Sequence, residues 1–344
     1  MKKLVIFMAG MVLALKTFSQ DKPFAFWDDP KGMILNQSGQ LFEQIDRYLR
    51  KLTPDTTRLE DRKLPLFALD ALYHDERTDG SEAEKIFFEK RYKDILTALM
   101  LPANKDQLVV YKLYNHGFIV KTATVTFAFD VVSGPFFDGK RFPLMEESTF
   151  HQVLDQVDIF FVSHFHGDHA DEQVRDYALK KGKAVVVPPG LWENQGDLVK
   201  HWRGQQVQAF SYPLKKKGGS LSVHVLPGHQ GDKVLNNVYV VTTPEGYAVA
   251  HTGDQANDQD LEWIGKVKEQ VKTDILLVNC WNTQIPAVVE GLAPRLVIPG
   301  HENELGHSID HREPHWLSYQ HLAQSKVPYI IMTVGEQYRY QRGI

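Results

Sequence analysis

Three histidines and one aspartate stand close together in the sequence, directly after a short, mainly apolar run. The run covers residues 157–162 and is typical of a buried strand. The pattern that follows is H-x-H-x-D-H, formed by His164, His166, Asp168 and His169. Alternate side chains of an extended segment point to the same side, so His164 and His166 can hold one cation while Asp168 and His169 face a second. A histidine-rich surface turn is the alternative, and the buried strand directly before the cluster argues against it.

Three further strands predicted from the sequence also end in residues that can bind a metal. Strand 220–226 leads to His229, strand 247–251 to Asp254 and strand 295–298 to His301. Such ends converge in layered α/β proteins, because neighbouring strands open at a common edge. One ion would be held by His164, His166 and His229, and a second by Asp168, His169 and His301, with Asp254 able to bridge the two. Seven ligands for two ions leave coordination positions open, which is typical of catalytic sites.

The chain divides into a helical part and a later part in which strands and helices alternate. Before about residue 105 apolar residues recur at helical spacing, with Ser38 as the expected start of one helix and Ser81 and Glu84 as the capping box of another. Short β-rich runs follow. We expect strands at 108–113, 117–122, 125–129, 184–187, 207–212, 238–242 and 274–278, and helices at 171–181, 257–271 and 284–292. Residues 136–152 are expected to form a loop.

The order of the ligand-type residues resembles the five motifs of the metallo-β-lactamase superfamily. The motifs are Asp130, the cluster at 164–169, His229, Asp254 and His301. The resemblance covers residues 106–340 and implies an α/β fold, the four-layer αβ/βα metallo-β-lactamase sandwich of two sheets flanked by helices. Together with the change of pattern near residue 105, this predicts a helical N-terminal extension at 20–105 and a hydrolase domain at 106–344. It also implies that Asp130 orients the ligand loop through hydrogen bonds and does not bind metal itself.

Three shorter stretches relate the chain to one branch of that superfamily. They are Gly228-His229-Gln230, Asn236-Asn237-Val238-Tyr239 and His251-Thr252-Gly253-Asp254. They resemble the ascorbate-6-phosphate lactonase-like and N-acylphosphatidylethanolamine phospholipase D-like enzymes. Diiron flavoproteins of the superfamily have a glutamate where this chain has His166, so the resemblance favours hydrolysis over oxygen reduction.

The first residues resemble a secretory signal peptide, here assigned to 1–19. Their apolar run, 4–15, is too short to cross a bilayer as a helix, so we expect a periplasmic or secreted mature chain without a transmembrane segment. The full chain has a formal net charge of −4, and cleavage would remove Lys2, Lys3 and Lys16 but no acid. An acidic chain without a basic run argues against nucleic acid as a partner and favours a small-molecule substrate. The oligomeric state stays open.

Together these features predict a secreted or periplasmic dinuclear metal-dependent hydrolase. A hydroxide bridging two divalent ions would attack an ester, lactone or phosphodiester bond. Zn2+ is the expected metal, and Mn2+ or Fe2+ would suit the same ligands. Asp168 is the expected catalytic residue, because a ligand beside the water can orient the hydroxide or move its proton. Two alternatives stay open: a phosphodiesterase or phospholipase D-like enzyme specifically, and a non-catalytic metal- or ligand-binding protein.

Several other residues near the motifs carry expectations of their own. His307 is a candidate for contact with the substrate, whereas His311 and His315 are expected at the solvent-exposed surface. His251 is expected to be a buried histidine with satisfied hydrogen bonds. Cys280 stands in an apolar stretch and is expected in the core.

Overall fold

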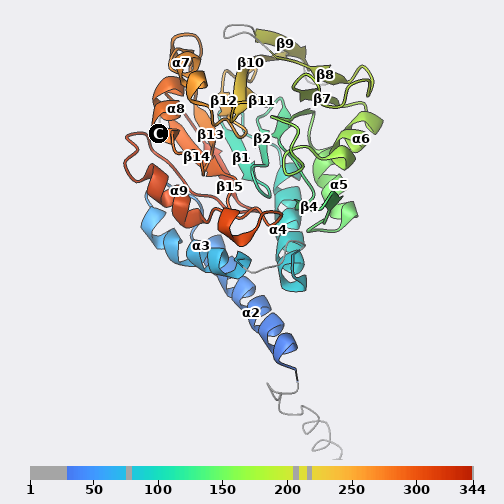
Figure 1. The fold of residues 1–344 in the computed structure, drawn as a ribbon, viewed down its shortest axis with the longest axis vertical. Coiled ribbons are helices and arrows are strands. Elements are labelled where there is room, and N and C mark those ends of the chain that lie inside the picture. Colours follow the sequence, from blue (N-terminus) through green and yellow to red (C-terminus); the bar gives the residue numbers. More distant parts are fainter. Residues whose placement is uncertain (1–28, 75–79, 204–208, 215–218, 343–344) are drawn as a thin grey trace, which may run out of the picture.

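Two β-sheets lie face to face in the centre of the molecule, and helices cover their outer sides (Figure 1). The coordinates are a computed structural model that describes residues 29–74, 80–203, 209–214 and 219–342, so the expected signal peptide at 1–19 lies outside the described residues. The helices are α2 (Pro30–Lys51), α3 (Leu59–Tyr73), α4 (Glu82–Met100), α5 (Glu147–Asp155), α6 (Glu172–Lys180), α7 (Leu261–Ile264), α8 (Ile285–Leu292) and α9 (His315–Leu322). Short 3-10 helices are η1 (Asp258–Asp260), η2 (Val267–Glu269) and η3 (Ile309–His311).

The two large sheets differ in their strand order. The strands are β1 (Leu108–Lys112), β2 (Phe118–Lys121), β3 (Thr126–Phe129), β4 (Phe136–Phe137), β5 (Lys140–Arg141), β6 (Ile159–Phe161), β7 (Ala184–Val187), β8 (Val199–His201), β9 (Ala209–Pro213), β10 (Ser220–Gln230), β11 (Val234–Thr242), β12 (Ala248–His251), β13 (Ile275–Asn279), β14 (Leu296–Gly300) and β15 (Gln337–Tyr340). The seven-stranded sheet has the order β15-β1-β2-β3-β6-β7-β8, and the six-stranded sheet has the order β14-β13-β12-β11-β10-β9. β4 and β5 form a separate ribbon.

Parallel pairing places the ends of the strands that lead to the candidate ligands at common edges. β6 runs parallel to its neighbours β3 and β7, and β13 runs parallel to β12 and β14. Parallel strands of one sheet end at the same edge, so the segments after β12 and β14 lie close together. The segment after β6 reaches the same place from the other sheet, because Ser163 O accepts a 2.8 Å hydrogen bond from Asn237 N of β11.

The alternation of side chains along the strands divides the core into two layers. In β1, Leu108 and Val110 point into the cluster between the two sheets, together with Leu277 of the opposite sheet. Val109 and Tyr111 point the other way, into the cluster under the helices. This two-residue period is the pattern from which the strand was predicted.

The N-terminal helices pack on the outer side of the seven-stranded sheet. Phe42 of α2, Leu66 of α3 and Tyr92 of α4 are buried in the same cluster as Tyr111 of β1. α2 extends furthest from the body of the molecule (Figure 1). None of the helices in the described ranges combines the length and apolarity needed to cross a membrane.

Two predicted helix starts had different outcomes. The capping box of α4 is confirmed, since Ser81 Oγ accepts from Glu84 N and the Glu84 carboxylate accepts from Ser81 N. Ser38 as a helix start is wrong, because α2 begins eight residues earlier at Pro30. Asp29 caps that end through a 2.9 Å hydrogen bond from Gly32 N, and Ser38 instead donates to Ile34 O inside the helix.

Two further expectations are corrected by the structure. Residues 257–271 do not form one helix: they form η1, α7 and η2, and Gly265, a poor helix former, ends α7. The segment 136–152 is not all loop, because it contains the β4–β5 ribbon and the start of α5. α5 is short, and its helical pattern is carried only by a few buried apolar residues such as Phe150 and Leu154.

Candidate metal centre

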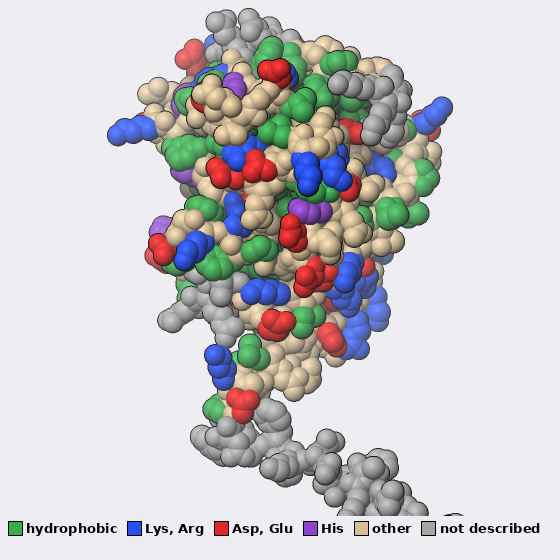
Figure 2. Space-filling model, turned by 90° about the vertical axis from the view of Figure 1, so that its right-hand side faces the viewer, with side chains coloured by type: hydrophobic (Ala, Val, Ile, Leu, Met, Phe, Trp, Pro, Cys, Tyr) green, Lys and Arg blue, Asp and Glu red, His purple; other side chains and the backbone are tan. Residues whose placement is uncertain are grey.

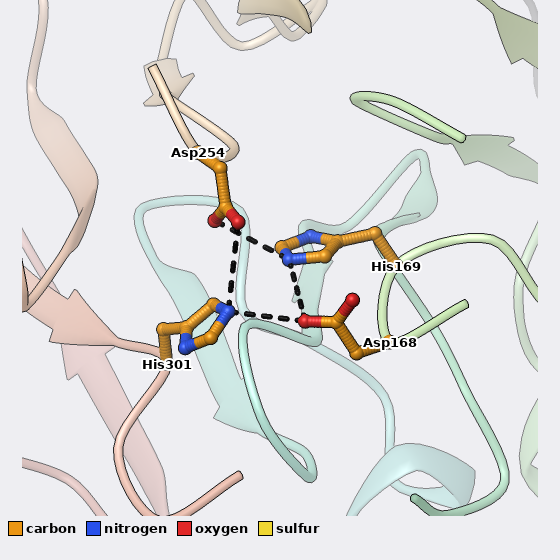
Figure 3. A group of neighbouring side chains, drawn as sticks. All are labelled: Asp168, His169, Asp254 and His301. Atoms are coloured by element: carbon orange, nitrogen blue, oxygen red, sulfur yellow. Dashed lines mark hydrogen bonds and ion pairs between the residues drawn. The ribbon is translucent and has the colours of Figure 1, made fainter. Parts of the chain in front are cut away.

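Four buried side chains bring their ligand atoms to one point (Figure 3). They are Asp168, His169, Asp254 and His301. Each offers one ring nitrogen or carboxylate oxygen, and these four atoms all lie within 4.8 Å of one another. Asp168 Oδ2 lies 3.1 Å from Nε2 of both His169 and His301. Asp254 Oδ1 lies 3.3 Å from His169 Nε2, and its Oδ2 lies 3.6 Å from His301 Nε2. Two imidazoles and two carboxylates in a buried cluster are a donor set that suits a divalent cation.

The electrostatics of the cluster also fit a cation. Burial alone would lower the pKa of His301, but the Asp254 and Asp168 carboxylates raise it to about 9. The pKa of His169 is raised in the same way, against the effect of its burial. The buried Nε2 of His169 makes no aligned hydrogen bond. A divalent ion would displace the protons of these two imidazoles and bind the freed nitrogen lone pairs, including that of His169 Nε2. The residues therefore fit such an ion.

Backbone conformation aims these side chains at their common point. Gly253, directly before Asp254, has φ of +52°. A Cβ atom there would lie 2.3 Å from Asn236 Oδ1 and 2.4 Å from Ser163 Cβ, so the turn after β12 requires glycine. His301 also has a positive φ, +74°, directly after β14.

Asp130 lies beneath the ligand loop and holds it through hydrogen bonds. Its Oδ2 accepts from His169 Nδ1 at 2.7 Å and from Ser163 Oγ at 2.6 Å, while its Oδ1 accepts from Ser163 N at 2.7 Å. A proton on His169 Nδ1 leaves Nε2 unprotonated in the neutral ring and turned towards the cluster. This geometry is what the expected orienting role of Asp130 requires.

His164 and His166 adjoin the four-residue cluster. His164 Nε2 lies 3.1 Å from His166 Nδ1 and 3.7 Å from Asp254 Oδ2. His164 is fully buried, and burial together with the charge of His169 lowers its pKa to about 3. The imidazole is therefore neutral at physiological pH, the form that binds metals. Asp254 thus lies near His164 as well as near His169 and His301.

His229 has different neighbours. Its backbone N donates to Asp260 Oδ2 at 2.7 Å, and its Nδ1 lies 3.0 Å from Asp260 Oδ1. Its Nε2, the atom expected to face a metal, lies 3.0 Å from Arg203 Nη2. Among the residues that the structure describes, no hydrogen bond or ion pair joins His229 to the other six predicted ligands. Hydrogen bonds and ion pairs therefore link six of the predicted ligands to one another, and a guanidinium lies beside the seventh.

Comparisons with known proteins bear on the fold. No family model matches the chain. A UPF0173 metal-dependent hydrolase of Chloroflexus aurantiacus is 26% identical over 140 residues, which span 36% of this chain and about half, 54%, of that protein. Igni18, a metallo hydrolase of Ignicoccus hospitalis, has a similar structure, with a TM-score of 0.52 at 16% identity over 68% of this chain and 99% of that one. An isothiocyanate hydrolase from Delia radicum gut bacteria has a TM-score of 0.50 at 13% identity over the same shares.

This chain has the metallo-β-lactamase fold. The two sheets, the flanking helices and the cluster at the strand ends agree with the α/β sandwich that the motifs imply. At these levels of identity the structural likeness concerns the fold alone.

Three amide side chains contact the carboxylates of the site, and these contacts were not predicted from the sequence. Asn279 Nδ2 donates to Asp254 Oδ1, and Gln230 Nε2 donates to Asp254 Oδ2 at 3.1 Å. Asn115 Nδ2 donates to Asp168 Oδ2 at 3.2 Å. Such contacts fix the orientation of carboxylates that bind metals. The signal that could have found Asn279 is its place at the end of β13, between the strands that lead to Asp254 and His301.

Four other histidines that the sequence analysis considered lie in different surroundings. His251 is buried with both ring nitrogens hydrogen-bonded, as predicted: Nδ1 accepts from Gly253 N and Nε2 donates to His116 O. The His307 ring lies 5.8 Å from that of His301, so its contact with a substrate stays a prediction. His311 is exposed as predicted, but exposure of His315 is wrong, because His315 is buried against Asp70 of α3 at 2.6 Å.

Proposed function

We propose that this chain is a dinuclear metal-dependent hydrolase that cleaves an ester, lactone or phosphodiester bond. The observation that carries the proposal is the buried group of Asp168, His169, Asp254 and His301, with His164 beside Asp254 and His166 beside His164. The similar proteins that are named as hydrolases support the same class of reaction.

The residues of the chain would bind the ions and orient the reacting water. The clustered residues, together with His164 and His166, would hold divalent ions, which would supply a water of near-neutral pKa and polarisation of the substrate oxygen. Asp168 Oδ2 lies beside Nε2 of His169 and Nε2 of His301. The other carboxylate oxygen, Oδ1, would accept a hydrogen bond from the reacting water. Burial opposes ionisation of Asp168, but the two histidines hold its pKa well below the usual range. Asp168 therefore stays charged and orients the water.

Arg203 favours an anionic substrate such as a phosphodiester. Its guanidinium is partly buried beside His229 and forms no ion pair with a carboxylate among the described residues. Its Nη1 is buried without a hydrogen bond. A desolvated guanidinium is stabilised by an anion that accepts its hydrogen bonds, and a phosphate group binds it in a forked geometry.

Replacement of Arg203 by glutamine tests this preference. We expect kcat/KM for a phosphodiester to fall by about 10- to 100-fold, because one charge-assisted contact is lost, while kcat/KM for a neutral lactone changes little. Arg203→Lys keeps the charge and should lose less. Equal losses on both substrates, measured by initial rates, would show that Arg203 does not recognise the anion.

Two further parts of the proposal are a small-molecule substrate, supported by the surface charges, and export from the cytoplasm, supported by residues 1–19. Lys and Arg side chains lie next to Asp and Glu side chains over most of the face in Figure 2. Nucleic-acid binding generally uses a continuous basic patch, so this mixture favours a small-molecule substrate. Export from the cytoplasm rests on the charged, apolar and small-residue pattern of residues 1–19.

The test of the proposal is the initial hydrolysis rate of protein loaded with zinc or manganese, measured on bis(p-nitrophenyl) phosphate and on a simple lactone. Turnover of either substrate above the metal-free background supports the hydrolase, and preference for the phosphodiester supports the phosphodiesterase form. A metal-loaded protein that turns over neither substrate but binds one of them tightly would be a binding protein, and the proposal would be wrong.

A further inference from the structure

The loop that carries His301 has an unusual backbone, and its imidazole is hydrogen-bonded on one side only, where Nε2 lies 3.1 Å from Asp168 Oδ2. His301 and Asn303 have φ of +74° and +55°, in the left-handed region that non-glycine residues rarely adopt. His169 is oriented by Asp130, whereas the buried Nδ1 of His301 has no hydrogen-bond partner among the described residues. The position of the His301 ring therefore depends on Asp168 and on the contacts that hold the loop, which include a 2.8 Å hydrogen bond from Asn303 N to Glu313 O.

A carboxylate from the N-terminal helices contacts this loop through the side chain of Asn303. Asp70 of α3 is buried, and its Oδ1 accepts from Asn303 Nδ2 at 2.9 Å. The same oxygen accepts from His315 N at 2.9 Å and lies 2.6 Å from His315 Nδ1. Asp70 Oδ2 accepts from Trp316 N at 3.2 Å. One side chain thus joins the residue two positions after His301 to the start of α9.

Asp70 caps the start of α9, which has no capping side chain of its own. α9 begins after Pro314, which cannot cap it with a side chain, so Asp70 satisfies the free N–H groups of its first turn from another helix. The end of α3 is fastened to the loop a second time. Arg312 donates to Tyr73 O at 2.7 Å and to Leu305 O at 2.9 Å.

Asp70 and His315 form a buried ion pair. Burial opposes both charges, but each group stabilises the other: His315 lowers the pKa of Asp70, and Asp70 raises the pKa of His315. Loss of one partner of a buried pair leaves the other charge uncompensated, so the contact between α3 and the loop depends on both residues.

We propose that the N-terminal helices complete the metal site, and that Asp70 is the positioning residue that fixes the His301 loop through Asn303 and His315. The inference rests on the proposed metal site and assigns a role to the helical segment before residue 105. Asp70 does not touch the ligand atoms, so it acts on the metal only through the loop.

Asp46 offers a matched control. It is a fully buried carboxylate of α2, and it pairs with Arg50, Lys90 and Arg91 at 2.9, 2.7 and 3.1 Å. All its ion-pair partners belong to the N-terminal helices. Asp46→Asn and Asp70→Asn therefore both remove one buried negative charge, but only Asp70→Asn loosens the His301 loop.

The experiment measures Tm and metal affinity of the full chain in both variants. Metal affinity is obtained by competition with a chelator, and the visible spectrum of the cobalt-loaded protein reports ligand geometry. We expect both variants to lower Tm. Asp70→Asn should weaken metal binding by about 10- to 100-fold and alter the cobalt spectrum. Asp46→Asn should leave affinity within about twofold of the wild type, because it lies away from the site.

The outcomes separate this inference from the proposed function. Equal metal affinity and cobalt spectra in the two variants would overturn the inference while wild-type metal binding upheld the site. A wild-type chain that bound no divalent ion would overturn both. Asn303→Gly removes the amide that contacts Asp70 and tolerates the positive φ, so it carries the same test if Asp70→Asn does not fold. Unchanged metal affinity in that variant would also contradict the inference.

Discussion

Replacing Asp254 by alanine is expected to lower hydrolysis by about 10³-fold or more, because metal ions supply several kcal/mol of transition-state stabilisation. The carboxylate lies within 3.7 Å of His164, His169 and His301, so it adjoins both proposed metal positions. The metal content, measured by elemental analysis of the purified variant, should fall together with the rate.

Asp274→Asn is the control for loss of a buried aspartate. Asp274 is buried but pairs with Arg342 at 2.6 Å and contacts no predicted ligand. This variant should lose stability while it keeps its metal. An Asp254→Ala protein with full activity and unchanged metal stoichiometry would remove Asp254 from the site.

His166→Ala is expected to reduce the metal content from two ions per chain to one and to reduce turnover severely. His166 and His164 form the proposed first position, and the four-residue cluster that would hold the second ion stays intact in this variant. His311→Ala is the matched control, because His311 is exposed and away from the cluster, and both quantities should stay near wild type. Equal metal content in His166→Ala and wild type would mean that the first position does not exist as proposed.

The sequence predicted best the part of the site whose residues are close together in the chain. His164, His166, Asp168 and His169 follow one strand, and their proximity needs only that strand and its turn. Asp254 and His301 were predicted to join them because their strands end at one edge, and in the structure both side chains lie beside Asp168 and His169. The strand at 184–187 was also predicted to the residue, since its continuous apolar run leaves no ambiguity.

The contacts that the sequence did not predict join residues far apart in the chain. Asp70 and His315 are 245 positions apart, and no local pattern links them, so His315 was wrongly expected at the surface. The contacts of Asn115 with Asp168 and of Asn279 with Asp254 each join the ends of strands in one sheet, so they depend on the strand order. Arg203 follows β8 of the seven-stranded sheet and reaches His229 of β10 in the other sheet, so this contact depends on how the two sheets pack. The division of the chain at residue 105 stays a prediction.

The central claim is tested most directly by adding metal back to chelator-stripped protein while hydrolysis of bis(p-nitrophenyl) phosphate and bound metal are measured together. The account predicts no turnover without metal and a rate that rises with added zinc or manganese until two ions are bound per chain. Turnover that survives removal of all metal, or a fully loaded protein without turnover on any ester, lactone or phosphodiester, would contradict it.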